Sequence, residues 1–517
     1  MVQFGGTMNK TINGNGHGGG HLDSAHVREI APRKTASRSG AGATVINESR
    51  VIFRATEGAE VHGRLVNFSR QSAAFELFGE SVVLRSSETL TEFQIQIQGQ
   101  KIYYGQAVIT ALLDNASKIV CEVDLDENLW TPAPEFLSTM TQPDGVAKAF
   151  NQFEREWQKL YIVSPDFKVI VADLEIFLHD LKIWLDRVES NLATLPAVKR
   201  GLVERQLAQE IGKITSPRLT TMFEKFEAVL NRVEPGSHPA HSVFARRILH
   251  PLLMGSPFLH RTFYKPLGYA GDYEMVNMLS RDPFEGKSLF AKIVNLWFWE
   301  QPPAEAHRNR LIYLANQIEV EAHRLARFGR RVRVFNFACG PALEIQNFLK
   351  KSPMAGRVDF LLADFNGETL EHTKRIMEEI KERRGLGTAF QFAKKSVHQL
   401  LKDSGHLLLS GNDGKPLYDF VYCAGLFDYL SDRTCLELMN AFYSFVAPGG
   451  LLVSTNVATS NPRIPTMDHV MAWHLIYRNV PQFADLRPGG SSPEDCVVKA
   501  DATGVNLFLE VRKPEHG

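Results

Sequence analysis

The sequence predicts a multidomain protein with a small antiparallel β-barrel, an all-helical middle region and a C-terminal α/β domain built on a doubly wound parallel sheet. Three patterns predict these parts. Apolar residues alternate with period two over residues 46–140 and recur every three to four positions over residues 141–328. Candidate strands and helices then alternate over residues 329–517. A chain of 517 residues is also too long for one ordinary core.

Composition restricts the class of protein. Lys plus Arg and Asp plus Glu each total 58, so nothing indicates the clustered basic excess of a surface that binds a nucleic-acid polymer. The five scattered cysteines form no CxxC pair, and we expect no disulfide framework and no metal site. We find no signal-peptide core and no apolar run of the roughly 18 residues that a membrane span needs. We therefore expect a cytoplasmic protein. The sequence does not determine its oligomeric state.

Residues 1–45 are rich in Gly, Ser, Asn and His. Such a segment cannot bury enough apolar surface to offset the entropy of ordering, so we expect a disordered tail. His17, His21 and His26 have no acidic or cysteine partners nearby, and we favour a solvated tail over a metal site.

The barrel is predicted from short alternating runs, namely RVIFRA, VHGRLVNF, AAFELF, FQIQIQGQKIYYGQAVIT and KIVCEVDL. Arg50-x-x-x-Arg54 and the stretch NFSRQS at 67–72 resemble the motifs of PilZ domains, small β-barrels that bind cyclic di-GMP. The resemblance implies that Arg50, Arg54, Asn67 and Ser69 bind this ligand, with the arginines clamping it from a flexible segment. Ser72 stands where the motif has glycine, and a degenerate barrel used only for docking is the alternative.

The middle region opens with a good helix start. Pro165 follows Ser164 and precedes Asp166, and proline is favoured at the first helical position. The apolar residues between 167 and 188 then keep a spacing of three to four, which gives one wide apolar stripe. We expect further helices broken at TSPRL (215–219), EPGSHP (234–239) and MGSP (254–257), all packed on their neighbours.

The C-terminal domain is predicted from the candidate strands VRVFNF, VDFLLADF, FQFAKKSV, YDFVYCAG and GLLVSTNV. A helix beginning near Leu343 lies between the first two strands, and ETLEHTKRIMEEIKERRG lies between the second and third. This alternation predicts a parallel, doubly wound sheet.

The stretch FNFACGPALEIQNF at 335–348 combines the end of a strand, a turn of small residues and the start of a helix. Ala338 and Ala342 occupy positions where ligand loops usually have glycine, and alanine allows close approach where positive φ is not required. Asp364 ends the next strand, where such folds place a carboxylate for ribose hydroxyls. Loop and acid together favour an adenosine ligand. A dinucleotide stays open, as does a tight turn without a ligand.

Several motifs resemble class I S-adenosylmethionine-dependent methyltransferases. The loop ACGPALE, the acid in LLADFN, the stretch YDFVYCAGLFDYLSD and the turn in APGGLLVSTN follow each other in that family's order. HRTFYKPLGYAGDYEM (260–275), GLFDYL (425–430) and AWHLIYR (472–478) resemble a narrower bacterial group, described as making fatty-acid methyl ester signals of the 3-hydroxypalmitic acid methyl ester type. This resemblance covers about residues 150–517 and implies a Rossmann-like methyltransferase domain.

The resemblance implies S-adenosylmethionine as cofactor. The residues expected to bind it are Ala338, Cys339, Gly340, Glu344, Asp364, Ser396 and Gly425, with Tyr264, Tyr269 and Asp272 from the tyrosine-rich segment. We expect that segment to form a lid over the cofactor, because loops on rigid scaffolds commonly carry function. A kinked linker with stacking tyrosines is the alternative.

Methyl transfer from a sulfonium requires different residues for different acceptors. A carboxylate is already nucleophilic and needs positioning and desolvation, whereas a hydroxyl or amine needs a general base. The candidate catalytic residues are Asp428, Tyr429, His474, Tyr477 and Arg478. Arg478 is expected to pair with an acceptor carboxylate, while ordinary helix packing is the alternative for Trp473, His474 and Tyr477.

The acceptor is expected to be a small molecule or a lipid-like molecule, and the carboxyl group of a 3-hydroxy fatty acid is the specific hypothesis. Two alternatives stay open at this point. One is an O- or N-methyltransferase of a small natural product. The other is a cyclic di-GMP effector whose methyltransferase half is a non-catalytic scaffold.

Overall fold

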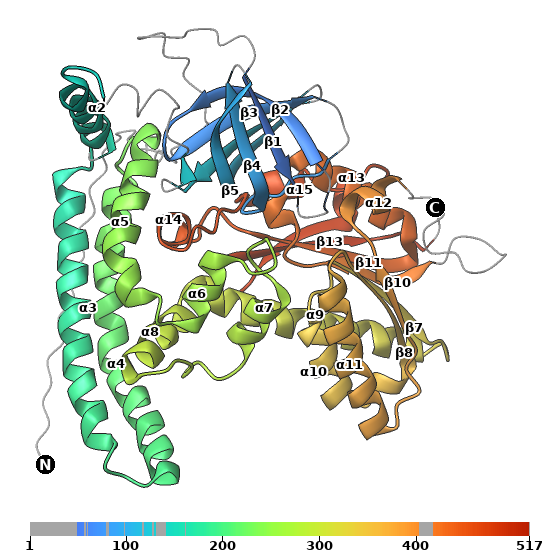
Figure 1. The fold of residues 1–517 in the computed structure, drawn as a ribbon. Coiled ribbons are helices and arrows are strands. Elements are labelled where there is room, and N and C mark those ends of the chain that lie inside the picture. The colour runs from blue at the N-terminus through green and yellow to red at the C-terminus, as the bar shows by residue number, and fades with distance from the viewer. Residues whose placement is uncertain are drawn as a thin grey trace, which may run out of the picture. The chain divides into compact units, whose positions relative to one another are not determined.

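The described strands of the N-terminal part pair in a closed circle, so the sheet forms an antiparallel barrel (Figure 1). The structure is a computed structural model, which describes residues 49–55, 58, 60–78, 82–97, 99–115, 118–126, 129–130, 141–160, 162–402 and 417–515. The predicted tail at 1–45, with its three histidines, lies outside these residues. The barrel order is β1 (Ser49–Arg54), β2 (Glu60–Phe68), β3 (Ser72–Phe78), β6 (Lys118–Leu125), β5 (Gln100–Asn115) and β4 (Thr89–Ile97).

Helices fill the middle of the described chain. They are α2 (Gly145–Leu160), α3 (Pro165–Leu192), α4 (Ala197–Leu230), α5 (His238–Leu253), α6 (Pro257–Tyr264), α7 (Tyr273–Ser280), α8 (Leu289–Glu300) and α9 (Pro302–Ala326). The predicted start of α3 is confirmed, because the Ser164 hydroxyl accepts a hydrogen bond from the backbone N–H of Phe167 at 3.2 Å. The large core of these helices includes Met467 and Val470 from the C-terminal part, as expected for helices that pack on their neighbours.

One predicted helix break is wrong. The helix α4 continues through TSPRL with Pro217 inside it. Pro217 lies on the exposed side of the helix, as does Lys213, whose carbonyl loses its intrahelical partner. On an exposed side of a helix water can take the place of the lost partner, so proline costs less here than on a buried side. The interruptions predicted at EPGSHP and MGSP do separate α4 from α5 and α5 from α6.

The C-terminal sheet has seven strands in the described chain, in the order β12-β13-β11-β10-β7-β8-β9. The bounds are β7 (Val332–Phe337), β8 (Val358–Asp364), β9 (Phe390–Lys394), β10 (Tyr418–Cys423), β11 (Val446–Val457), β12 (Cys496–Ala500) and β13 (Asn506–Arg512). Strands β7 to β11 are parallel to each other, whereas β13 runs antiparallel to β11 and β12 antiparallel to β13. The five predicted strands are confirmed, and β12 and β13 were not predicted.

Helices cover both faces of this sheet (Figure 1). On one face, α9, α10 (Leu343–Lys351) and α11 (Gly367–Arg384) pack on side chains such as Val334, Phe360 and Tyr422. On the other, α12 (Val397–Lys402), α13 (Asp432–Phe445) and α15 (Val480–Ala484) pack on Phe335 and Val421. A sheet buried on both faces explains the continuous apolar runs of the sequence. The predicted layout of barrel, helical middle and C-terminal α/β sheet is confirmed.

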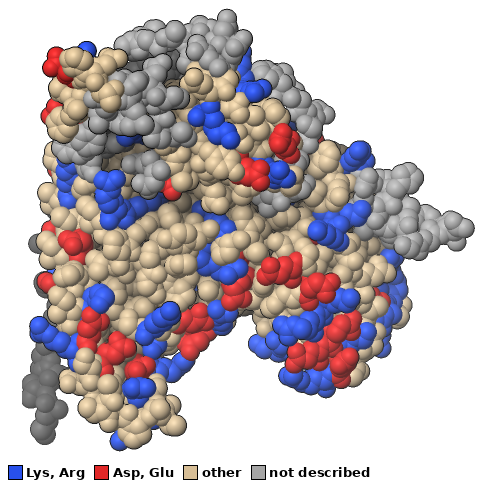
Figure 2. Space-filling model, in the orientation of Figure 1, with Lys and Arg blue, Asp and Glu red and all other residues tan. Residues whose placement is uncertain are grey.

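The described surface mixes charges of both signs. On the face drawn in Figure 2, Lys and Arg side chains lie among Asp and Glu side chains over the helical and α/β parts. Within the described chain, no helix combines the length and the apolar character of a membrane-spanning segment.

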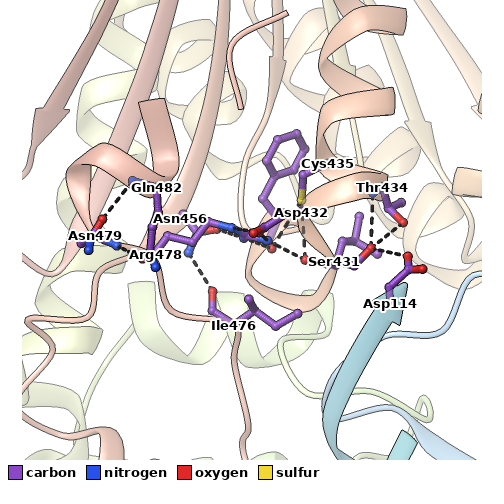
Figure 3. A network of polar contacts seen from close by, with 12 residues as sticks. Asp114, Ser431, Asp432, Thr434, Cys435, Asn456, Ile476, Arg478, Asn479 and Gln482 are labelled. Atoms are coloured by element: carbon purple, nitrogen blue, oxygen red, sulfur yellow. Dashed lines mark hydrogen bonds and ion pairs between the residues drawn. The ribbon is translucent and has the colours of Figure 1, made fainter. Parts of the chain in front are cut away.

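A buried arginine joins three segments of the C-terminal part (Figure 3). Arg478 is 2% exposed. Its guanidinium donates to the carbonyls of Phe427 and Leu430 at 2.8 and 2.7 Å, to the side chain of Asn456, and to Asp432 at 2.8 Å. All three guanidinium nitrogens are therefore used within the protein. The prediction that Arg478 binds an acceptor carboxylate is wrong, because acceptors within the protein already take up the donors of its guanidinium. The sequence motif does not reveal these acceptors.

The neighbouring cap of α13 extends this network to the barrel. The Ser431 hydroxyl, which caps α13, donates to the Asp114 carboxylate of β5 at 2.7 Å (Figure 3). Asn456 of β11 donates to the carbonyl of Ile476 at 2.9 Å. Barrel, α13 and the segment after β11 are thus joined by side-chain hydrogen bonds.

The role of Arg478 in the fold can be tested by substitution. Arg478→Ala leaves two buried carbonyls and a buried amide without their donor, so we expect a loss of about 3 kcal/mol of stability. Arg433→Ala, on the exposed side of α13, should change stability by less than about 0.5 kcal/mol. The urea midpoint of each variant measures this. An Arg478→Ala variant with the wild-type midpoint would contradict the structural role.

Candidate active site

A cavity of about 190 Å³ lies at the carboxyl ends of the parallel strands. Its lining includes Ala338 after β7, Asp364 at the end of β8, Gly425 after β10 and Val457 at the end of β11. The chain runs from β7 outward to β8 and β9, then returns to place β10 on the other side of β7. The strand order reverses at this point, and open α/β sheets bind their ligands in the crevice that such a reversal leaves.

The loop between β7 and α10 has a left-handed backbone at alternate residues. The φ angles are +56° at Ala338, +52° at Gly340 and +48° at Ala342. Alanine was expected to allow close approach of a ligand where positive φ is not required, but both alanines adopt positive φ here. Each alanine adopts the conformation at a cost of about 1–2 kcal/mol. Such strain persists where the surroundings hold it, and it gathers at ligand sites.

Asp364 holds this loop from the next strand. Its carboxylate accepts hydrogen bonds from the backbone N–H groups of Gly340 at 3.1 Å and Asn366 at 3.0 Å. Burial raises the pKa of Asp364, and the two N–H groups and the charge of Arg85 act in the opposite direction. The structure therefore brings the loop and the acid of the second strand into direct contact.

A second buried carboxylate stands in the first turn of α10. Glu344 accepts hydrogen bonds from the Tyr422 hydroxyl at 2.7 Å and the Asn336 amide at 3.2 Å. Burial raises its pKa. Glu344, Asn336 and the neighbouring Cys339 all line the cavity. The side-chain Oδ1 atom of Asn336 has no hydrogen-bond partner in the described chain.

Asp428 and Tyr429 follow β10 and also line the cavity, as predicted. The Asp428 carboxylate accepts a hydrogen bond from the backbone N–H of Val457, and burial raises the pKa of Asp428. The Tyr429 hydroxyl accepts a hydrogen bond from the Trp473 indole at 2.9 Å.

The tyrosine-rich segment before α7 reaches the cavity only in part. Tyr269 and Gly271 line it. A Cβ at Gly271 would lie 2.6 Å from the Tyr429 hydroxyl, so only glycine fits there. Tyr264 and Asp272 do not line the cavity. Tyr264 is 60% exposed, and the Asp272 carboxylate caps α7 and pairs with Arg261 at 2.8 Å.

Two residues of α9 face the cavity and were missed by the sequence analysis. His307 and Arg310 lie one helical turn apart beside Leu314, also on the cavity lining. Both ring nitrogens of His307 and the Nε atom of Arg310 are buried without a hydrogen-bond partner in the described chain. Burial lowers the pKa of His307 far below its usual value, so the ring is neutral. A histidine and an arginine on an otherwise apolar helix face were the available signal.

Arg310 lies between two acids of the site. The nearby charges of Asp428 and Glu344 partly offset the lowering of its pKa by burial. A Cβ at Gly425 would lie 2.9 Å from the Nη1 atom of Arg310, so Gly425 leaves room for the guanidinium. Gly425, which is predicted to bind the cofactor, thus lies on the cavity lining against Arg310.

The barrel also supplies cavity residues that the sequence analysis missed. Arg85 and Ser86, from the loop between β3 and β4, line the same cavity. Nothing in the local sequence VVLRSSETL distinguishes this loop from an ordinary barrel connection.

The remaining predicted residues lie outside the lining. Ser396 caps α12, where its hydroxyl accepts a hydrogen bond from the N–H of Gln399 at 3.3 Å. His474 lies 3.4 Å from the Asp468 carboxylate. The buried Tyr477 hydroxyl has no hydrogen-bond partner in the described chain. We therefore do not place Ser396, His474 or Tyr477 in direct contact with a cavity ligand.

Two of the residues predicted for cyclic di-GMP, Arg54 and Asn67, lie far apart on the barrel. Arg50 and Arg54 both lie within β1 rather than on a flexible segment, and Arg54 pairs with Glu92 at 3.3 Å. Arg54 is opposite Glu60 at the start of β2. Asn67 is seven residues further along β2, a distance of roughly 20 Å in an extended strand.

No family model and no curated protein matches this chain. A possible exported protein from Bordetella parapertussis is similar at 18% identity over 56% of this chain and 92% of that one, with a TM-score of 0.38. An O-methyltransferase family protein from Burkholderia thailandensis is similar at 14% identity over 63% and 100%, with a TM-score of 0.29. Magnesium protoporphyrin IX methyltransferase from Synechocystis PCC 6803, with bound SAH, has 9% identity over 40% and 84%, with a TM-score of 0.28. Likenesses this distant decide neither ligand nor reaction, for which the geometry above is the basis.

Proposed function

We propose that this chain is an S-adenosylmethionine-dependent methyltransferase that acts on an apolar acceptor. The observation that carries the proposal is the contact between Gly340 and Asp364 at the reversal of strand order. Two backbone N–H groups orient a buried carboxylate beside the loop that follows the first strand of the sheet. A carboxylate in this place accepts hydrogen bonds from the hydroxyl groups of a ribose, as the motif resemblance implies.

Glu344 favours S-adenosylmethionine over a dinucleotide. A dinucleotide places its pyrophosphate at the N-terminus of the helix that follows the first strand. In this protein that helix begins with Leu343, and the buried carboxylate of Glu344 lies in its first turn. Such a group repels a pyrophosphate and attracts the ammonium and sulfonium charges of S-adenosylmethionine.

Arg310 fits the carboxylate of the cofactor's amino-acid part. Its guanidinium is buried at the cavity, and its Nε atom has no hydrogen-bond partner in the described chain. A buried cation without such partners is costly, and a bound carboxylate satisfies its planar donors. Asp364 then holds the nucleoside end, and Arg310 holds the amino-acid end.

The residues of the site position the reactants and exclude water. When bound, S-adenosylmethionine supplies an electrophilic methyl group. Tyr269 and Gly271 of the tyrosine-rich segment line the cavity, as do Gly425, Asp428 and Tyr429. Holding an acceptor in line within such an enclosed site favours displacement through orientation and desolvation.

The acceptor side of the cavity is apolar. It is lined by Phe258, Met275, Val276, Leu279, Phe298, Met467 and Met471. These side chains come from α6, α7, α8 and the region of α14 (Ile464–His469). The helical middle thus supplies apolar lining that suits the acyl chain of a lipid. We propose carboxyl O-methylation of a 3-hydroxy fatty acid, in line with the resemblance to the fatty-acid methyl ester group. A carboxylate acceptor needs no base.

His307 favours a second candidate, methylation of a hydroxyl group on a small natural product. The His307 ring lines the cavity with two nitrogens that have no hydrogen-bond partner in the described chain, and the unprotonated one can accept a hydrogen bond from a hydroxyl acceptor and take up its proton. A 3-hydroxy fatty acid offers both groups, so one substrate can distinguish the two reactions.

Cyclic di-GMP is a separate proposal for the barrel and rests on the PilZ resemblance alone. The separation of Arg54 from Asn67 argues against one site made by all four predicted residues. Calorimetry with cyclic di-GMP, on the same preparation as used for S-adenosylmethionine, distinguishes the methyltransferase from a non-catalytic effector. The effector hypothesis predicts that the protein binds cyclic di-GMP and transfers no methyl group.

Asp364 should hold the nucleoside part of the cofactor. Loss of a charge-assisted hydrogen bond costs about 1.5–3 kcal/mol, so Asp364→Ala should weaken binding roughly ten- to hundredfold. Calorimetry should show this for S-adenosylmethionine and for 5′-methylthioadenosine, which lacks the amino-acid part. Asp364→Asn, which keeps the size of the side chain, checks for loss of folding. Unchanged affinity in both variants would remove Asp364 from the site.

Arg310 should act only on the amino-acid part. Arg310→Ala should lower the affinity for S-adenosylmethionine by roughly ten- to hundredfold and leave that for 5′-methylthioadenosine unchanged. Arg308→Ala, at a neighbouring position whose side chain stacks on Trp299, is the control. Equal losses for both ligands would mean that Arg310 supports the fold and not the carboxylate.

The acceptor can be identified with labelled S-adenosylmethionine and 3-hydroxy fatty acids. Label in an alkali-labile ester supports carboxyl transfer, and His307→Gln should then change turnover less than about tenfold. Label in an alkali-stable ether supports hydroxyl transfer, and His307→Gln should then reduce turnover by about 10²–10⁴-fold. Label only on added amines or phenols, and none on the lipid, would contradict the fatty-acid acceptor.

A further inference from the structure

The loop between β3 and β4 of the barrel, together with the first residue of β4, contacts three segments that each supply residues to the cavity lining. The Ser86 N–H donates to the carbonyl of Tyr429 at 3.0 Å, and the Thr89 N–H donates to the carbonyl of Gly268 at 2.8 Å. The hydroxyls of Ser86 and Ser87 donate to the carbonyl of His474 at 2.9 and 3.0 Å. The end of this barrel connection thus joins the tyrosine-rich segment, the turn after β10 and the segment after β11.

Arg85 carries this loop to the nucleoside end of the cavity. Its guanidinium carbon lies 4.1 Å from the ring centroid of Phe365, and Arg85 is 5% exposed. Phe365 directly follows Asp364, and its ring also contacts Tyr269 at 5.1 Å between centroids. Arg85 and Tyr269 therefore both contact Phe365, the residue next to Asp364, which is proposed to bind the ribose. The positive charge of Arg85 favours the ionised form of Asp364.

The loop is held in a strained conformation. Ser87 is fully buried with φ of +60°, a conformation that costs a non-glycine residue energy. The Arg85 N–H donates to the Glu88 carboxylate at 3.0 Å, and the Ser87 N–H donates to the carbonyl of Ile109 at 2.8 Å. These bonds fix the backbone from which Arg85 projects, which is the support that a positioning residue requires.

We propose that Arg85 is a positioning residue of the cofactor site, so that the barrel forms part of this site and raises its affinity for the nucleoside end of the cofactor. This inference rests on the proposed function. Arg85 acts through Phe365 and Asp364 rather than on the reacting atoms. Because linkage is reciprocal, the cofactor tightens the contact of the barrel loop by the same factor.

Calorimetry on the full chain tests the contribution of Arg85. Arg85→Ala should weaken the binding of S-adenosylmethionine and of 5′-methylthioadenosine by roughly tenfold each, as expected for a desolvated cation–aromatic contact. Arg85→Lys, which keeps the charge, should recover part of the loss. Lys101→Ala is the matched control, because Lys101 lies 4.6 Å from the centroid of Tyr104 on the outside of the barrel. It should bind like wild type.

Hydrogen–deuterium exchange gives a second readout. S-adenosylmethionine should slow exchange of the Ser86 and Thr89 amides in wild type and do so less in Arg85→Ala. Wild-type affinity and wild-type protection in Arg85→Ala would overturn the inference, as would tighter binding. These results leave the proposed function intact if wild type binds S-adenosylmethionine. A wild-type protein that binds neither ligand would overturn both.

Discussion

The reversal of strand order between β7 and β10 is the constraint on which the candidate site depends. Strands leave β7 in both directions, so the loops after β7 and β10 diverge and leave a crevice. Everything that lines the carboxyl edge of the sheet is then collected at one place, including Asp364, Glu344 and Asp428. Three carboxylates share this small buried space. Their charges are the main energetic problem of the site.

Among the groups that offset these charges are two arginines from outside the sheet, Arg310 beside Glu344 and Asp428 and Arg85 beside Asp364. Arg310 comes from α9, which precedes β7, and Arg85 comes from the barrel. Neither is placed by the topology of the sheet. Both depend on the packing of other parts against it, and this dependence makes the barrel and the helical middle more than appended domains. It also explains why hydrogen bonds such as that from Ser431 to Asp114 join these parts close to the cavity.

Local sequence patterns predicted what local chemistry determines. The cap of α3 at Ser164, the strand-to-helix loop at Gly340 and the acid at Asp364 each depend on a few neighbouring residues, and the structure has them where expected. Arg85, His307 and Arg310 could not be predicted in this way, because only tertiary packing brings them to the cavity. Arg478 shows the opposite error. A motif placed it near the site, but four acceptors from the turn before α13, from α13 and from β11 take up its donors.

Burial also limits which ligands this charge arrangement can accept. Burial raises the pKa values of Glu344, Asp364 and Asp428, so a positively charged ligand beside them favours their ionised forms and gains binding energy. A ligand dominated by phosphates would meet the same three groups and lose energy. A zwitterion with a cationic centre and one carboxylate matches three acids and the buried cation Arg310 together. This electrostatic match restricts the class of ligand more than the shape of the loop does, since alanines with strained backbones already replace two of the usual glycines.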